Sequence, residues 1–260
     1  MADLSDNKFA YLKDKNIPQL MEYILQKLVT DLPENPMHYI GELMEEPVPP
    51  RIIVAGPPGS GKGTQCEAIA EKFGVVHIST GDLIREEATA DTEEGRELAQ
   101  LMEEGDLVPD EFISQLVYRR LQKDDAKRFG WLLDGFPRSK QQAMELDTWM
   151  CPPHLFILLD VADEEVFKRI EHRRADPVTG NVYHLIFNPP PKSDKELWNR
   201  LVQRTDDHRD TVAKRLEVYR EEISWLMGHY GGITEVVDGN QGIRAVTADV
   251  LKTVESRLLR

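Results

Sequence analysis

The spacing of apolar residues along the chain changes near residue 50. Ahead of it, two sets of apolar residues recur at helical spacing on either side of the turn signal LPENP: Leu20, Ile24 and Leu28, then Ile40, Leu43 and Met44. These sets predict a hairpin of two short helices, of about 14 and 10 residues. Prolines at 47, 49 and 50 then predict a stiff linker, because proline cannot extend a helix.

Beyond the linker, short β-branched and apolar runs alternate with helical stretches. The runs cover residues 52–55, 75–78, 131–133, 155–159 and 233–237. A helix is expected from about Lys62 to Lys72, and the last helix carries an apolar face of Ile243, Val246, Val250 and Val254. Such alternation is typical of strands that are covered on both sides. It predicts an α/β fold with a central parallel five-stranded sheet and helices on both faces.

One stretch departs from this alternation. Residues 176–203 contain the turn signals DPVTG and FNPPP with short extended pieces, and they show no long helical pattern. We therefore expect an inserted lobe outside the sheet.

Composition narrows the classes of partner. The 260 residues carry a formal net charge of -14, which argues against a nucleic acid or an anionic membrane as the main partner. Two cysteines, Cys66 and Cys151, cannot build a disulfide framework and favour a reducing compartment. The N-terminal residues lack an apolar signal core, and their acidic side chains disfavour a transit peptide. A cytoplasmic protein is expected.

The segment GPPGSGKGT, Gly56 to Thr64, lies between a predicted strand and a predicted helix. In that context a glycine-rich loop binds phosphate, because its backbone N–H groups and the helix N-terminus converge on the anion. Lys62 is expected to reach the β- and γ-phosphates of a nucleotide. Gly63 stands where serine or threonine usually contacts Mg²⁺, and the hydroxyl comes one residue later, at Thr64.

This GKGT ending and four further segments resemble the adenylate kinase family. The segments are ISTGDLIR (78–85), DGFPRSKQQ (134–142), RIEHRRADPVTGNVYH (169–184) and RTDDHRDTVAKRL (204–216). The resemblance covers residues 51–260 and implies the fold of the P-loop NTPases. It implies a kinase domain at 49–260, with an AMP-binding region at about 79–109 and a lid lobe at about 174–207, and it leaves residues 1–48 as a separate hairpin.

The resemblance also implies reversible phosphoryl transfer from Mg-ATP to AMP, giving two ADP, and roles for individual residues. The residues implied to be catalytic are Lys62, Arg138, Arg173, Arg204 and Arg215. ATP binding falls to Gly59, Ser60, Gly61, Lys62, Gly63, Thr64, Arg169, Arg173, Tyr183 and Gln241. AMP binding falls to Thr80, Arg85, Val108, Gly135, Arg138, Gln142, Arg204 and Arg215. Asp82 and Asp134 are expected to hold Mg²⁺ through water.

The chemistry independently favours such residues. A nucleotide phosphate is already an anion at neutral pH, so the attacking oxygen needs no catalytic base. Arginine suits the remaining task, because its planar fork binds phosphate oxygens in pairs and keeps its charge. His77 and His184 are therefore not expected to act as bases. The lid lobe contains no cysteine, which excludes a four-thiolate zinc site, so hydrogen bonds from Asp176 and Thr179 are expected to stiffen it.

Other functions remain open at this stage. A UMP/CMP kinase or a kinase with GTP as donor would share the fold, and Gln65 after GKGT only weakly favours ATP. From another class, a non-catalytic nucleotide-sensing scaffold is disfavoured, because every motif lysine and arginine is present.

The segment Tyr11 to Glu46 resembles the dimerisation-and-docking modules of protein kinase A regulatory subunits. It shares their Ile-Pro start, their apolar spacing and a proline-containing turn. The resemblance implies a homodimer formed through residues 8–46, a groove for an amphipathic anchoring helix, and placement in a cilium or flagellum. The alternative is a monomer whose hairpin packs on its own kinase domain.

Overall fold

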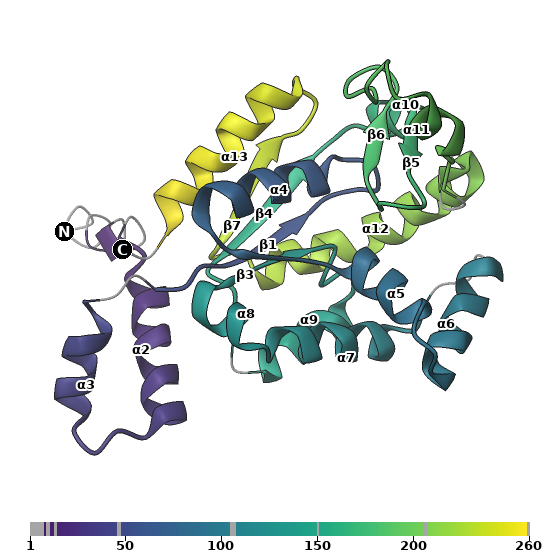
Figure 1. Ribbon diagram of the computed structural model, residues 1–260. Coiled ribbons are helices and arrows are strands. Elements are labelled where there is room, and N and C mark those ends of the chain that lie inside the picture. Colours follow the sequence, from purple (N-terminus) through teal and green to yellow (C-terminus); the bar gives the residue numbers. More distant parts are fainter. Residues whose placement is uncertain are drawn as a thin grey trace.

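A computed structural model describes residues 8, 11–12, 15–45, 48–104, 108–149, 151–204 and 207–258. Its centre is a five-stranded parallel sheet with the strand order β2-β3-β1-β4-β7 (Figure 1). The strands are β1 (Arg51–Ala55), β2 (Val76–Ser79), β3 (Trp131–Asp134), β4 (Leu155–Asp160) and β7 (Thr234–Asp238). The predicted parallel α/β fold is confirmed, and each strand lies within one residue of its predicted bounds. Among the described residues, no helix combines the length and apolar character needed to span a bilayer.

Helices cover both faces of this sheet because its side chains alternate between two cores. One core packs under α4 (Lys62–Phe73) and α13 (Ile243–Arg257), and Leu132 points into it together with Cys66 and Val250. The other core receives Trp131 and Leu133. It lies against α7 (Asp110–Leu121), α8 (Asp124–Phe129), α9 (Lys140–Thr148) and α12 (Arg209–His229). Both cores are therefore built from the apolar runs that the sequence pattern identified.

Four further helices and a small sheet complete the part of the chain that follows the linker. Helices α5 (Thr80–Ala88) and α6 (Glu93–Glu104) follow β2, and α10 (Asp163–Glu171) follows β4. The lid lobe holds an antiparallel pair, β5 (Arg173–Ala175) and β6 (Val182–His184), and the short helix α11 (Lys195–Arg200). The sequence pattern did not predict α11. Its six residues are too few to show a periodicity, and it begins where the Asp194 side chain accepts a hydrogen bond from the backbone N–H of Leu197 at 2.9 Å.

Asp176 joins the parts of the lid lobe. Its carboxylate is buried and accepts two hydrogen bonds from Arg200, each at 2.8 Å. It also accepts one from the Thr179 hydroxyl at 2.7 Å and one from the backbone N–H of Val178 at 3.0 Å. The hydrogen bonds from Arg200 lower the pKa of Asp176 far below its usual value. Polar contacts thus join both ends of the lobe, and the hydrogen bonds expected of Asp176 and Thr179 are present.

The N-terminal hairpin consists of α2 (Ile17–Asp31) and α3 (Pro36–Leu43), and it projects from the rest of the molecule (Figure 1). Tyr23 is its anchor: the ring is 5% exposed, packs with Val48, and lies under the Arg51 guanidinium at 5.8 Å. Arg51 also donates a hydrogen bond to Gln26 at 3.1 Å. The apolar spacing singled out Leu20, Ile24 and Leu28 instead, and these are only half-buried.

Candidate active site

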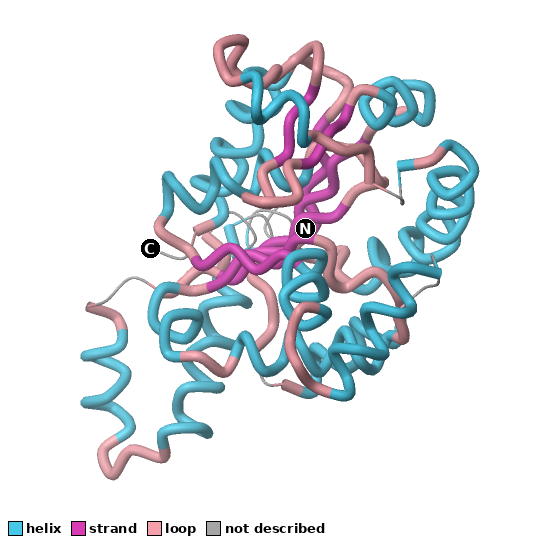
Figure 2. The backbone as a smooth tube through the Cα atoms, turned by 45° about the vertical axis from the view of Figure 1, so that its right-hand side comes forward, coloured by secondary structure: helices cyan, strands magenta, loops and turns pink. Residues whose placement is uncertain are grey.

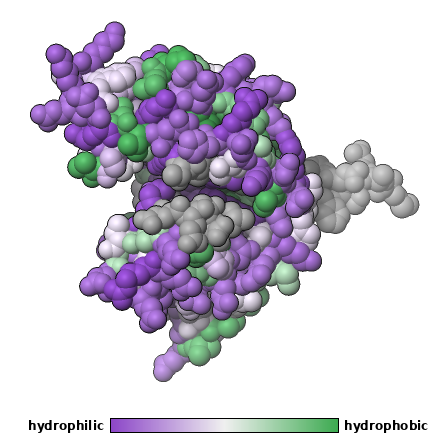
Figure 3. Space-filling model, turned by 90° about the vertical axis from the view of Figure 1, so that its right-hand side faces the viewer, coloured by the Kyte–Doolittle hydropathy of each residue, from purple (hydrophilic) through white to green (hydrophobic). Residues whose placement is uncertain are grey.

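The candidate site lies at the carboxyl ends of the strands, where β1 sits between β3 and β4. The chain leaves β1 toward one edge of the sheet for β2 and β3, and later returns to the other edge for β4 and β7. Parallel sheets bind ligands at such a change of direction. Figure 2 shows the lid lobe beyond this end of the sheet, and Figure 3 shows the surface hollowed between two lobes of the molecule.

The glycine-rich loop curls between β1 and α4. Lys62 folds back over it, and its ammonium donates hydrogen bonds to the backbone carbonyls of Gly56 at 2.9 Å and Pro57 at 2.8 Å. Gly59 has φ 73°, and a Cβ there would lie 2.6 Å from a side-chain carbon of Ile170. Only glycine fits this conformation and this close approach to α10.

Two arginines raise the positive potential around Lys62. Burial is the main cause that lowers the pKa of Lys62 to about 8; the Asp134 carboxylate opposes this shift, and the charges of Arg138 and Arg215 add to it. Arg138 follows β3 and Arg215 belongs to α12, so segments far apart in the sequence bring three cations together. A cluster of like charges is unfavourable unless an anion binds between them.

The segment after β3 holds Arg138 in place. Its Nε donates to the Gly135 carbonyl at 2.6 Å, and its Nη2 lies 3.5 Å from the Thr80 hydroxyl. Gly135 has φ 80°, and a Cβ there would lie 2.5 Å from that Nη2 atom. The Thr80 hydroxyl is itself 3.1 Å from the carbonyls of Asp134 and Gly135. Thr80, Gly135 and Arg138, predicted for AMP binding, therefore form one contact network.

Gln142 has a second task that the sequence reading missed. Its side chain is buried, its oxygen accepts from the backbone N–H of Arg138 at 2.7 Å, and its nitrogen donates to Asp110 at 2.7 Å. Asp110 also accepts a hydrogen bond from the Ser139 hydroxyl. The pattern Ser139-x-x-Gln142 signals a capped helix start, and the Ser139 hydroxyl accepts from the backbone N–H of Gln142 at 3.3 Å. This signal could have identified Gln142 as a residue that positions Arg138.

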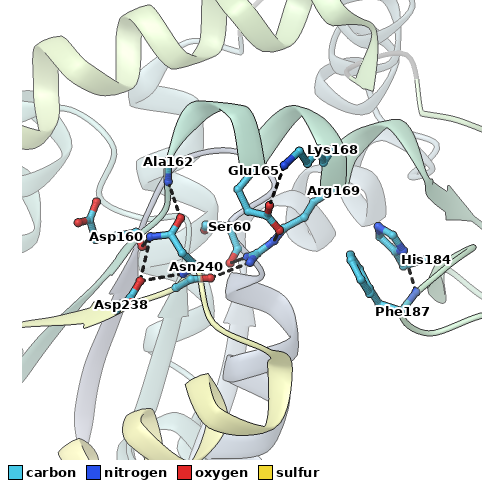
Figure 4. A network of polar contacts seen from close by, with 11 residues as sticks. Ser60, Asp160, Ala162, Glu165, Lys168, Arg169, His184, Phe187, Asp238 and Asn240 are labelled. Carbon is cyan, nitrogen blue, oxygen red and sulfur yellow. Dashed lines mark hydrogen bonds and ion pairs between the residues drawn. The ribbon is translucent and has the colours of Figure 1, made fainter.

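Arg169 ties the phosphate loop to the segment after β7 (Figure 4). Its guanidinium donates to the Ser60 carbonyl at 3.2 Å, to the Gly239 carbonyl at 2.7 Å, and to Glu165 at 3.2 Å. Gln241, two residues beyond Gly239, donates to the Asp238 carbonyl at 3.3 Å and to Asp249 at 3.2 Å. The structure therefore brings the predicted ATP-binding residues Ser60, Arg169 and Gln241 to one border of the site.

Arg173 and Arg85 each pair with an aspartate. Arg173 binds the buried Asp207 carboxylate with two hydrogen bonds, one of them 2.9 Å from Nε. Arg85 hydrogen-bonds Asp82. Burial raises the pKa of Asp82, but Arg85, together with the Ser79 hydroxyl and the charge of Arg204, leaves it below its usual value.

Tyr183 and His184 lie on β6, and Val108 begins the segment ahead of α7, where it is half-buried. The Nδ1 atom of His184 accepts hydrogen bonds from the backbone N–H groups of Ile186 at 3.2 Å and Phe187 at 3.1 Å. Its ring stacks on Phe187 with centroids 4.5 Å apart. Burial lowers the pKa of His184, which makes the ring a weaker base. These contacts shape the lid lobe.

The candidate Mg²⁺ ligands differ in their surroundings. Asp134 closes β3 beside the phosphate loop, and its Oδ2 atom faces the first turn of α4, 3.7 Å from where a Cβ of Gly63 would lie. A carboxylate in that position suits a hard cation that keeps most of its waters. Asp82, on α5, is held by Arg85. Asp134 therefore fits Mg²⁺ in this structure, while Asp82 would first have to leave its arginine.

The adenylate kinase family model matches residues 54–234, which hold the glycine-rich loop and all four motif segments. The chain belongs to the adenylate kinase family. It is 45% identical over 210 residues to "Probable adenylate kinase 2, chloroplastic" of Oryza sativa subsp. japonica. The aligned residues make up 81% of this chain and 72% of the relative. It is 46% identical over 202 residues to "Adenylate kinase, chloroplastic" of Zea mays, with 78% and 90% covered. It is also 46% identical over 195 residues to "Adenylate kinase" of Trypanosoma brucei rhodesiense, with 74% and 91% covered.

Family membership confirms the predicted fold and makes the chain a nucleotide-binding transferase of the adenylate kinase class. It favours this class over the pyrimidine-nucleotide kinase, the GTP-using kinase and the non-catalytic scaffold. The hairpin α2–α3 lies ahead of the residues that the family model matches.

Proposed function

We propose that this adenylate kinase transfers the γ-phosphoryl group of Mg-ATP directly to the phosphate of AMP, between the loop after β1 and the segment after β3. One observation carries the proposal: the Lys62 ammonium is held over the phosphate loop at the carboxyl edge of the sheet, where the charges of Asp134, Arg138 and Arg215 all act on it. Two polyphosphates placed end to end would compensate that charge. The same reaction in reverse joins two ADP.

Positioning and charge supply the catalysis. Lys62 would leave the carbonyls of Gly56 and Pro57 and follow the transferring phosphoryl group, since a flexible ammonium tracks a moving charge. Arg138 and Arg85 would grip the AMP phosphate in the orientation that in-line attack requires. Arg173, Arg204 and Arg215 would neutralise the equatorial oxygens as the lid lobe closes.

The remaining assignments concern nucleotide ends and metal. Gly59, Ser60, Gly61, Gly63 and Thr64 would cradle the ATP phosphates, with Arg169, Tyr183 and Gln241 along the rest of that nucleotide. Thr80, Val108, Gly135 and Gln142 would border AMP. Asp134, and Asp82 after release from Arg85, would orient the waters of Mg²⁺. The bound Mg²⁺ would neutralise charge on the ATP phosphates.

A coupled phosphotransfer assay over AMP, CMP, UMP, GMP and dAMP tests this function. With Mg-ATP as donor we expect AMP to give the highest kcat/KM, since Thr80 and Gln142 would border the acceptor base. Activity should vanish on chelation of the divalent metal and return with Mg²⁺. Faster phosphorylation of CMP or UMP than of AMP would show that the acceptor assignment is wrong. A form lacking residues 1–48 serves as the control for the kinase domain.

We further propose that the hairpin pairs with a second copy of the chain and presents a groove to an anchoring helix. Three apolar side chains repeat every four residues on α2 and are open to solvent: Met21 is 53% exposed, Leu25 62% and Val29 56%. Met37 on α3 is 78% exposed. Helices this short need such a stripe buried to be stable. Anchoring near motor ATPases, in a cilium or flagellum, would let the kinase recycle their ADP where it forms.

Substitution Leu25→Glu should convert a full-length dimer to a monomer in sedimentation or light scattering, while AMP phosphorylation stays unchanged. A charge at the centre of the stripe leaves the hairpin's contact with the kinase domain intact, because that contact uses Tyr23 and Gln26. Met144→Glu is the matched control, because Met144 on α9 is also an exposed apolar helix residue, at 53% against 62% for Leu25. A wild-type protein that is monomeric at tens of micromolar would refute the pairing.

A further inference from the structure

Three side chains of types that can coordinate a metal meet behind the phosphate loop. His77 on β2 is registered with Leu132 on β3, and Asp134 lies two residues farther along β3. Because side chains alternate along a strand, Leu132, Asp134 and His77 all point toward the same face of the sheet. Cys66 on α4 belongs to the same buried cluster as Leu132 on that face. One ligand atom from each of Cys66, His77 and Asp134 lies within 4.8 Å of the other two.

One polar atom of this cluster lacks a hydrogen-bond partner among the described residues. It is the Nε2 atom of His77, which is sealed from solvent. The group it faces is the Asp134 carboxylate, whose Oδ2 lies 3.6 Å away. A buried polar atom without a partner costs free energy, so such an atom calls for an explanation, which a ligand can supply. Cys66, on the third side, is fully buried.

We propose that Cys66, His77 and Asp134 form a capture site for a thiophilic divalent cation, with Zn²⁺ as the fitting ion. One sulfur, one imidazole nitrogen and one carboxylate oxygen are ligands that Zn²⁺ takes in tetrahedral sites with an open fourth position. Ligand atoms at zinc bond lengths stand about 3.3–3.8 Å apart around such an ion. The separation between His77 and Asp134 already lies in that range, so Cys66 makes the remaining adjustment.

The ligand chemistry separates this site from the Mg²⁺ site. Mg²⁺ prefers oxygen and keeps its water, whereas sulfur and imidazole select zinc-like ions. Because only the thiolate of a cysteine binds a metal, the cation would displace the proton of the Cys66 thiol to solvent.

Occupancy would inhibit the enzyme. The ion would take the Asp134 carboxylate that the Mg²⁺ waters need and would place a positive charge behind Lys62. This consequence rests on the proposed function, whereas metal binding does not. The site would thus make phosphoryl transfer sensitive to free Zn²⁺ even when Mg²⁺ is in large excess.

Cobalt and zinc titrations of the full-length, reduced, nucleotide-free protein test the site. Co²⁺ should bind with a thiolate-to-cobalt charge-transfer band and the visible absorption of tetrahedral cobalt. Cys66→Ser should abolish the charge-transfer band. His77→Gln should weaken Zn²⁺ binding, measured by competition with a chromophoric chelator, at least tenfold. Cys151→Ser is the matched control: Cys151 lies ahead of β4, at the amino end of the sheet, and its loss should change neither signal.

Circular dichroism and thermal unfolding establish that each variant is folded. The cobalt spectrum of the wild-type protein tests the site even if a variant fails to fold. In assays with excess Mg²⁺, half-inhibition should need at least tenfold more Zn²⁺ for His77→Gln than for the wild type or Cys151→Ser. A wild-type spectrum without a thiolate band, a band that survives Cys66→Ser, or Zn²⁺ affinity unchanged in His77→Gln would overturn the site. Binding as expected without inhibition would leave the site intact and refute the role of Asp134 toward Mg²⁺.

Discussion

Substitution Lys62→Met should lower kcat for ADP formation by about a hundred- to a thousandfold, because it removes one preorganised charge that the transition state uses. The ground-state contacts of Lys62 are two backbone carbonyls of its own loop, at 2.9 and 2.8 Å. Methionine keeps most of the apolar stem and gives up only the ammonium. Steady-state rates with saturating ATP and AMP measure the effect, and KM for AMP should change little.

Lys72→Met is the matched control for this substitution. Lys72 lies in the last turn of the same helix, α4, where it forms an exposed ion pair with Glu255 at 3.4 Å. Exposed pairs of this kind contribute little stability, so activity and thermal unfolding should both stay close to the wild type. If Lys62→Met retained near-normal kcat while it stayed folded, Lys62 would have no part in the transfer.

The free enzyme should also lose affinity for ATP in alkaline solution. The pKa of Lys62 is lowered to about 8, so its protonated fraction falls as the pH rises through that value. Because only the ammonium attracts phosphate, kcat/KM for ATP should decline above about pH 8, whereas kcat should hold to higher pH since bound phosphates stabilise the cation. The same decline in Lys62→Met would assign the titration to another group.

Arg138→Ala should lower kcat by about two orders of magnitude and raise KM for AMP, because it removes a planar fork aimed at the acceptor phosphate. Arg138→Lys should recover only part of this loss, since a single ammonium cannot bind two phosphate oxygens in the same fixed geometry. The structure holds this guanidinium to the Gly135 carbonyl at 2.6 Å, so its orientation is set before the substrate arrives.

Arg128→Ala provides the comparison for Arg138→Ala. Arg128 is exposed on α8, which ends just ahead of β3 and therefore lies at the amino end of the sheet, away from the site. Its loss should leave both kinetic constants unchanged. A folded Arg138→Ala enzyme with wild-type KM for AMP would show that the acceptor phosphate binds elsewhere.

The periodicity of the sequence could predict the sheet because each strand is apolar on both faces. Ile52, Ile53 and Val54 are all buried, as expected for a central parallel strand. The glycine-rich loop could also be predicted from a short stretch of sequence, because its glycines, Lys62 and the flanking elements all lie within some fifteen residues. Family membership followed from motifs of that kind. By contrast, α11 escaped prediction because it depends on one capping side chain and one buried leucine.

The hairpin shows why a local sequence pattern does not predict how one part of the chain packs on another. Leu20, Ile24 and Leu28 share a helical face, yet the residue that seats α2 on the kinase domain is Tyr23, which meets Val48 and Arg51. Amphipathic spacing shows which side of a helix is apolar. It does not say which neighbouring segment will cover that face, because that choice depends on packing between parts distant in the sequence.

By itself, the sequence determined the parallel α/β fold, the phosphate loop and the family, because each depends on residue types at short, fixed spacing. Only the tertiary structure decided which charges meet. It brought Arg138 and Arg215 to Lys62, engaged Gln142 in holding Arg138, and placed Cys66 and His77 beside Asp134. The physical reason is that electrostatic and metal-binding properties depend on distances across the sheet, and those distances arise only when strands and helices that are far apart along the chain pack together.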